Sequence, residues 1–239
     1  DKAVQLVKDK LSSDTDTNKV HNLVSQYLGQ HSHPIHRLNY NLKRAIFELG
    51  PTGYPFEDFM AKVLQRYGFS TKVGVTLNGK CITHEIDIVA KKNNTTYYIE
   101  CKFHNRPGLK TDIQTALYTN ARFQDITDGV SEINNHHSWL ITNTKITKDV
   151  DSYAKCQNMK LTSWCCPGKE SLFHLVVNSG LHPITAINSL SFDQMSLLLK
   201  QGVVTLKDLL NLIKNNHLKN LLSKQDIKKI KAEITGIYS

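Results

Sequence analysis

The stretch HEIDIVAKKNNTTYYIECKFHN, residues 84–105, consists of two runs of strand-forming residues joined at Asn93-Asn94. Two asparagines between β-branched and aromatic runs are typical of a two-residue hairpin turn. With that turn, Lys92 faces Thr95 and the pairing runs back along both strands. The stretch therefore predicts an antiparallel hairpin.

Continued along the two strands, this register places Asp87 opposite Glu100 and Glu85 opposite Lys102. Because successive side chains of a strand point to opposite faces, all four charged residues share one side. The apolar side chains then share the other side, and these are Ile86, Ile88, Ile99 and Cys101. The hairpin is predicted to have one charged face and one buried face.

The facing carboxylates have two interpretations. Like charges opposite each other destabilise a hairpin, and a divalent cation between Asp87 and Glu100 would remove that penalty. Mg²⁺ prefers a few carboxylate oxygens together with waters and phosphates, and Lys102 would then orient the attacking water and stabilise charge on phosphorus. In the alternative, the face is solvated and Glu85 forms an ion pair with Lys102, because charged outer faces of antiparallel sheets are common.

The helical pattern FEDFMAKVLQRYG, residues 56–68, precedes the hairpin and contributes a third acidic residue. At about 100° per residue, Glu57 lies at the edge of the apolar stripe and Asp58 lies on the far side. We expect Glu57 to reach toward the acidic face of the hairpin. Its alternative role is that of a first-turn glutamate stabilised by the helix dipole.

The order Glu57, Asp87, Glu100 and Lys102 resembles the PD-(D/E)XK nuclease superfamily, in particular Mrr-type restriction endonuclease domains. The matching stretches read GYPFEDF, HEIDIVA and YYIECKF, and the resemblance covers roughly residues 50–178. It implies a restriction-endonuclease-like α/β fold, in which a mixed central sheet is flanked by helices. It also implies metal-dependent hydrolysis of a phosphodiester bond.

The same resemblance implies roles for individual residues. Asp87 and Glu100 would be metal ligands, Lys102 the catalytic lysine, and Glu57 an additional acidic ligand. The metal would be Mg²⁺, for which Mn²⁺ can substitute. In similar domains a glutamine on the helix after the hairpin borders the active site, and Gln114 matches it.

Three more residues are candidates for contacts with nucleic acid. Tyr118 and Arg122 follow Gln114 at spacings of four and share its helix face, where they would contact phosphate. An ordinary helix face packed beside the sheet is the alternative. His104 shares the face of Glu100 if the strand continues that far, and is either a substrate contact or a polar residue at the strand end.

Composition and charge limit the class of protein. The 239 residues suit one or two domains, and the net charge of +9 favours a polyanionic partner, with nucleic acid first among them. The chain has no apolar run long enough for a membrane helix, so no membrane contact is expected. The five cysteines show no disulfide spacing, which indicates reduced thiols and a cytoplasmic location.

The chain divides into three segments by pattern. Residues 1–49 are helical, residues 50–178 have the nuclease-like order of helices and strands, and residues 179–239 form a small helical domain. The segment LLLKQGVVTLKDLL resembles helix-hairpin-helix units, which bind phosphate at a turn, although Gln201-Gly202-Val203 lacks their double glycine. Residues 1–49 look like the end of an ATP-cone module, and no ATP site is expected in this chain.

The sequence thus predicts a Mg²⁺-dependent DNA endonuclease of the restriction type. By resemblance, a homodimer is expected, because each subunit would cut one strand. One alternative is a structure-specific nuclease of the Holliday-junction type, which uses the same active-site residues. The other is a non-catalytic DNA-binding protein on the same fold.

Overall fold

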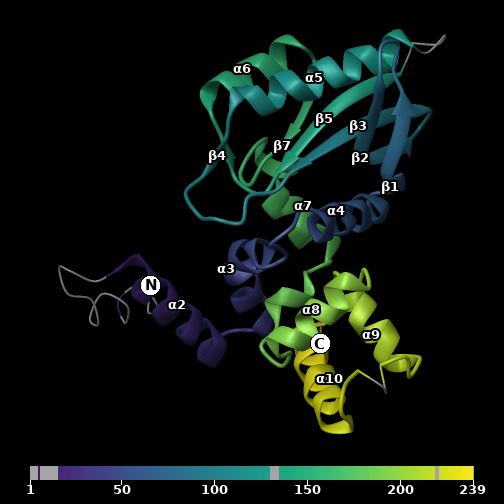
Figure 1. Cartoon of the computed structure of the whole chain (residues 1–239). Coiled ribbons are helices and arrows are strands. Elements are labelled where there is room, and N and C mark those ends of the chain that lie inside the picture. Colours follow the sequence, from purple (N-terminus) through teal and green to yellow (C-terminus); the bar gives the residue numbers. More distant parts are fainter. Residues whose placement is uncertain (1–4, 6–15, 130–134, 219–220, 239) are drawn as a thin grey trace.

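The computed structural model describes residues 5, 16–129, 135–218 and 221–238. Figure 1 shows the sheet at one end of the molecule, with α5 and α6 over one face and α4 and α7 along the other. The predicted mixed α/β fold is confirmed. The first part of the predicted N-terminal helical segment, residues 1–4 and 6–15, lies outside the described residues.

The helices before and within the nuclease-like region are α2 (Thr17–His31), α3 (Pro34–Phe47), α4 (Tyr54–Arg66), α5 (Ile113–Asp128), α6 (Lys148–Cys156) and α7 (Leu172–Ser179). The main sheet has the strands β1 (Ser70–Asn78), β2 (Thr83–Lys92), β3 (Thr95–Lys102), β5 (His136–Thr142) and β7 (Lys160–Thr162), in the order β1-β2-β3-β5-β7. The first three strands are antiparallel, and β3, β5 and β7 are parallel. A separate parallel ribbon consists of β4 (Lys110–Thr111) and β6 (Lys145–Ile146).

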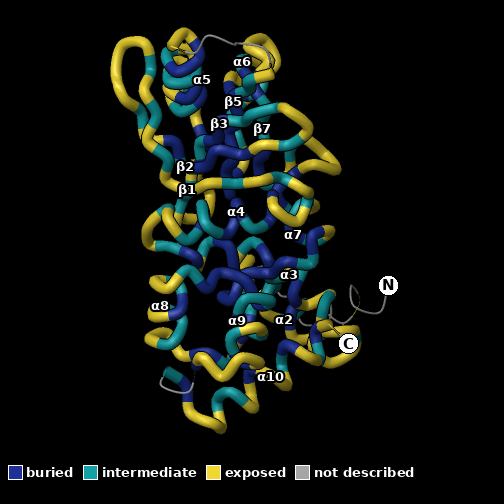
Figure 2. The backbone as a smooth tube through the Cα atoms, turned by 90° about the vertical axis from the view of Figure 1, so that its right-hand side faces the viewer, coloured by how far each residue is buried: buried dark blue, intermediate teal, exposed yellow. Residues whose placement is uncertain are grey.

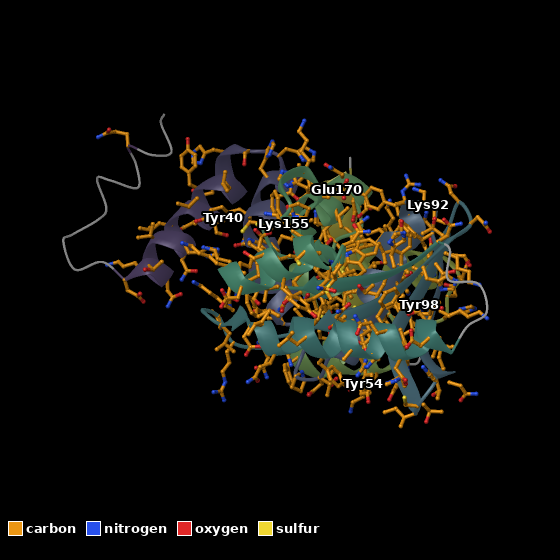
Figure 3. The ribbon with its side chains drawn as sticks, turned by 90° about the horizontal axis from the view of Figure 1, so that it is seen from above. Tyr40, Tyr54, Lys92, Tyr98, Lys155 and Glu170 are labelled. Atoms are coloured by element: carbon orange, nitrogen blue, oxygen red, sulfur yellow. The ribbon has the colours of Figure 1, made fainter. Side chains whose placement is uncertain are left out.

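The hairpin turn and its register are as predicted. Asn93 and Asn94 have φ of 48° and 61°, the left-handed values that a tight hairpin turn requires at both central residues. Lys92 pairs with Thr95, and the pairing continues along the two strands. In Figure 3, Lys92 and Tyr98 lie toward the same end of the sheet, which is the turn end of this hairpin.

The far end of the hairpin differs from the prediction. The pairing of β2 with β3 ends at Ile88 and Ile99, one pair before Asp87 and Glu100. Beyond this point each strand pairs only with its other neighbour: Glu85 with Thr76 of β1, and Lys102 with Thr142 of β5. The predicted pair of Glu85 with Lys102 is therefore wrong.

The predicted shared face of Ile86 and Ile88 is also wrong. Ile88 packs into the core beneath the sheet, whereas Ile86 packs on the α5 side against Val75 and Ile126. The flanking pairs place Gly74 of β1 opposite the residue between these two isoleucines, and its φ is +61°. Glycine adopts this left-handed backbone conformation readily, and the conformation changes the local twist of β1 next to the point where β2 loses its alternation of faces.

The largest core lies between the sheet and the helices α3, α4 and α7. Its fully buried side chains include Phe56, Phe59, Met60, Leu64, Ile88, Ile99 and Trp139. A second cluster joins α5 to β5 and α6 on the opposite face. Figure 2 shows the buried segments continuing from the sheet through α4 and α7 to α3. Both faces of the parallel strands are thus covered.

The C-terminal helices are α8 (Phe192–Lys200), α9 (Leu206–Lys214) and α10 (Lys224–Tyr238), and they enclose a cluster of their own. Helix α3 belongs to both cores, because Leu42 and Ile46 pack beneath the sheet and Leu38 packs with the C-terminal helices. No helix in the described part of the chain combines the length and apolar character that crossing a membrane requires.

The glycine turn between α8 and α9 faces the nuclease-like region. The N–H groups of Gln201, Gly202 and Val203 all donate to carbonyls of α8, and the Gly202 carbonyl accepts a hydrogen bond from Lys62 of α4 at 3.1 Å. Lys62 also pairs with Asp208 at 2.7 Å. Because its N–H groups are already used, this turn does not offer them to a phosphate.

The junction between α3 and the C-terminal helices gives a pH-dependent prediction. Burial, with a smaller contribution from Lys207, lowers the pKa of His182 to about 4, and the ring's Nε2 lies 2.8 Å from Asn39 Oδ1. Between pH 6.5 and 4 the unfolded chain binds a proton that the folded chain does not, so stability falls as the pH falls through this range. His182→Gln should remove about 2 kcal/mol of the stability change between pH 7 and pH 5.

Denaturant unfolding at the two pH values measures this difference. The control is His217→Gln, because His217 is exposed and should leave the pH dependence unchanged. Equal pH dependence in the wild type and His182→Gln would contradict the prediction.

Candidate active site

The acidic residues meet where β2 and β3 separate. Beyond Ile99, strand β3 continues beside β5 while β2 continues beside β1. The Asp87 carboxylate lies in the gap, and its Oδ2 accepts a hydrogen bond of 2.7 Å from the N–H of Cys101. The Asp87 side chain thus takes the place of the backbone pairing that β2 and β3 no longer form here. Asp87 is fixed beside Glu100 at the open end of the hairpin.

Glu57 joins this pair from the first turn of α4, as predicted, and Asp58 lies on the other side of the helix beside Lys62. Burial, and then the negative charge of Asp87, raise the pKa of both Glu57 and Glu100 to about 7. Burial also raises the pKa of Asp87, against the lowering effect of its backbone hydrogen bond. The three carboxyl groups are close enough for their charges to repel one another.

Arg122 of α5 supplies the counter-charge. Its Nη1 donates to Glu100 Oε2 at 2.6 Å and to the backbone carbonyl of Glu85 at 2.9 Å, and its Nη2 donates to the Tyr118 hydroxyl. The guanidinium also lies over the Tyr118 ring, 4.4 Å from its centroid. Sequence reasoning placed Arg122 at a phosphate, but in the structure it neutralises an acidic residue of the site.

The remaining predicted residues come from the end of β3, the loop after it and the first half of α5. Lys102 and Gln114 are both exposed, and the charge of Lys102 acts on Glu100. Gln114 is in the first turn of α5, whereas Tyr118 is 57% exposed beside Arg122. His104 is held in a hydrogen bond of 3.1 Å between its Nε2 and Thr111 Oγ1, so its ring is not free on the surface.

Sequence reasoning missed the polar residues that hold the loop after Lys102. Asn143 is fully buried, and its side chain accepts from the His104 N–H at 2.9 Å and donates to the His104 carbonyl at 2.8 Å. The run of threonines around Asn143, in WLITNT, directly after a buried strand, was the available signal. The role of Asn143 depends on the backbone of His104, which only the fold brings close to it.

A divalent cation fits the chemistry of this donor set, though not the present arrangement of the side chains. The described residues contain no group of three or more His, Cys, Asp or Glu side chains already arranged around a metal position. Glu100 instead binds Arg122. Mg²⁺ and Mn²⁺ prefer oxygen ligands such as carboxylates, and a cation bound here would offset the repulsion among Glu57, Asp87 and Glu100.

Comparison with known proteins agrees with this geometry. Residues 51–164 match a family model described as a restriction endonuclease, and residues 182–238 match one described as AF1548-like, C-terminal. An uncharacterised protein of Archaeoglobus fulgidus is 38% identical over 153 residues, which are 64% of this chain and 84% of that protein.

The crystal structure of a protein of unknown function, AF1548, matches with a TM-score of 0.66 and 33% identity, over 78% of this chain and 98% of that chain. The chain belongs to the AF1548-like family. Its nuclease-like region is a restriction-endonuclease-like domain, as the predicted resemblance required. A weaker match is the structure of Can2 from Sulfobacillus thermosulfidooxidans in complex with cyclic tetra-adenylate. It has 13% identity and a TM-score of 0.40, and the match covers 69% of this chain and 57% of that chain.

The raised pKa values of the acidic cluster can be measured directly. Asp87→Asn removes the negative charge with the largest effect on both glutamates, so the pKa of Glu57 and Glu100 should fall from about 7 toward the ordinary 4.5. Carboxyl ¹³C NMR titration of the metal-free protein follows both glutamates. Asp128→Asn, at the exposed end of α5, is the control and should leave them unchanged. A wild-type Glu57 that titrates near 4.5 would be incompatible with the cluster described.

Proposed function

We propose that this AF1548-like protein is a divalent-metal-dependent DNA endonuclease of the restriction type. The observation that carries the proposal is the convergence of Glu57, Asp87 and Glu100, from three different elements, at the strand opening beside Lys102. The restriction-endonuclease-like domain supports hydrolysis of a phosphodiester bond. Asp87, Glu100 and Glu57 would bind Mg²⁺, for which Mn²⁺ can substitute.

The bound cation would act as a Lewis acid on the scissile phosphate and lower the pKa of a water molecule. The protein's own residues position the substrate around it. The exposed ammonium of Lys102 would donate to a phosphate oxygen and stabilise the charge that develops in the transition state. Gln114 and Tyr118, exposed on one face of α5, would contact the substrate beside it.

Several further predictions belong to this proposal. DNA is the proposed substrate because the net charge of +9 favours a polyanion. We also propose a cytoplasmic location, consistent with five free cysteines, and a homodimer that cuts both strands. The domain bounds 1–49, 50–178 and 179–239, and the ATP-cone origin of the first, stay predictions, as does the absence of an ATP site.

Plasmid cleavage with Mg²⁺ or Mn²⁺ tests the catalytic assignment. Asp87→Ala and Lys102→Ala should reduce nicking at least 100-fold, because each removes a group proposed to act on the phosphate, while DNA binding should persist. Glu57→Gln should also reduce cleavage. Its matched control is Asp58→Asn, the neighbouring residue that faces Lys62, which should retain activity.

Full activity in Asp87→Ala or Lys102→Ala would overturn the proposed site. A wild-type protein that binds DNA but never cuts it would instead support the non-catalytic DNA-binding alternative.

The Arg122–Glu100 ion pair predicts a competition with the metal. The two side chains are only 13% and 18% exposed, and Arg122 Nε is buried without a hydrogen-bond partner among the described residues. A cation that uses Glu100 must displace this charge-assisted hydrogen bond. Without DNA, Arg122→Gln should therefore bind Mn²⁺ roughly tenfold more tightly, as loss of one such competing bond implies.

Isothermal titration of Mn²⁺ into the protein without DNA measures this affinity, and thermal unfolding checks that the variant is folded. Arg44→Gln is the control, because Arg44 is an exposed arginine paired with Glu48 away from the site. Unchanged or weaker Mn²⁺ binding in a folded Arg122→Gln protein would contradict the competition.

A further inference from the structure

The short ribbon β4–β6 carries two like charges side by side. Lys110 of β4 and Lys145 of β6 are direct partners in a parallel pair, and both are exposed. Partners in register project to the same face of a ribbon, so the two ammonium groups lie close together. Like charges placed directly opposite each other destabilise strand pairing, and an anion bound between them offsets that repulsion.

A third positive charge comes from a distant part of the sequence. Lys43 of α3 lies with its ammonium 5.5 Å from the centroid of the Trp164 ring. Burial and the charge of Lys145 lower its pKa, while the Cys165 thiol acts in the opposite direction. Among the described residues, Lys43, Lys110 and Lys145 form no ion pair. We call these three residues the basic ribbon surface.

This surface is attached rigidly to the catalytic end of the sheet. Thr111, next to Lys110, has its Oγ1 2.8 Å from that of Thr142, and Thr142 is the strand partner of Lys102. Thr144 Oγ1 lies 3.3 Å from both threonine hydroxyls. All three threonines are buried. In Figure 1, β4 lies at the left of the sheet, at the end where β3 and β5 finish.

We propose that the basic ribbon surface binds the phosphate backbone of DNA and holds the duplex across the end of the sheet. The inference rests on the proposed function and adds a binding surface to it. Three cations without an ion pair among the described residues, linked through Thr111 and Thr142 to the strand end that carries Lys102, match a polyanion whose charges repeat along its length. Because backbone contacts carry no base information, this surface supplies affinity and register and no sequence preference.

DNA affinity measured without any divalent metal tests the surface separately from cleavage. The probe is a fluorescein-labelled duplex of about 20 base pairs in EDTA, and anisotropy is followed as a function of salt. Each lost phosphate contact should lower the slope of log K against log[salt] by about 0.9. Lys110→Gln/Lys145→Gln should thus lower it by about 2 and weaken binding roughly tenfold or more at low salt.

The matched control removes the same charge from another exposed site. Lys214→Gln/Lys224→Gln, in α9 and α10, should leave the slope and the affinity nearly unchanged. A wild-type slope in the ribbon variant, or an equal loss in the control, would overturn the proposal. If the double ribbon variant does not fold, Lys145→Gln alone should lower the slope by about 1.

The two proposals fail separately. A protein that binds DNA through this surface but does not cut it in Mg²⁺ or Mn²⁺ contradicts only the endonuclease function. A protein that cuts DNA while its ribbon variant binds with wild-type affinity contradicts only the basic ribbon surface.

Discussion

The hydrogen bond between the Asp87 carboxylate and the Cys101 N–H is the constraint on which the site depends. β2 and β3 must part here, because β3 pairs with β5 on one side while β2 follows β1 on the other. A buried N–H left without an acceptor at such a fork would be costly. By accepting it, Asp87 satisfies the backbone and is itself fixed at the opening. The same fork places Asp87 beside Glu100, close enough for its charge to raise the pKa of that glutamate.

The site holds more negative charge than its burial favours. Glu57, Asp87 and Glu100 come from three elements that pack for apolar reasons, and their pKa values are all raised by burial. The Arg122 guanidinium neutralises part of this charge. Nearby positive charge stabilises such an acidic cluster, and Arg122 and Lys102 both supply it to Glu100. Any other cation that binds Glu100 has to compete with this ion pair.

The sequence was informative where the physical cause was local. The asparagine turn fixed the register from Lys92–Thr95 to Ile88–Ile99, and helical periodicity separated Glu57 from Asp58. The prediction from the hairpin sequence failed at the open end of the hairpin. There the alternation of faces depends on the pairing of β2 with β1, which lies outside that stretch of sequence.

Two further parts of the site could not be predicted because their partners are distant. Asn143 acts through the backbone of His104, 39 residues earlier in the chain. Lys110 and Lys145 become neighbours only when β4 pairs with β6.

Helix α3 connects the site to the C-terminal helices. One part of its surface packs beneath the sheet through Leu42 and Ile46, and Leu38 packs into the C-terminal cluster. The same helix carries Lys43 of the basic ribbon surface. The C-terminal helices also bind α4 through Lys62, four helical positions from Asp58 and on the helix that carries Glu57. Because the glycine turn that resembles a phosphate-binding unit is used for this contact, the C-terminal region is tied to the helix that carries Glu57.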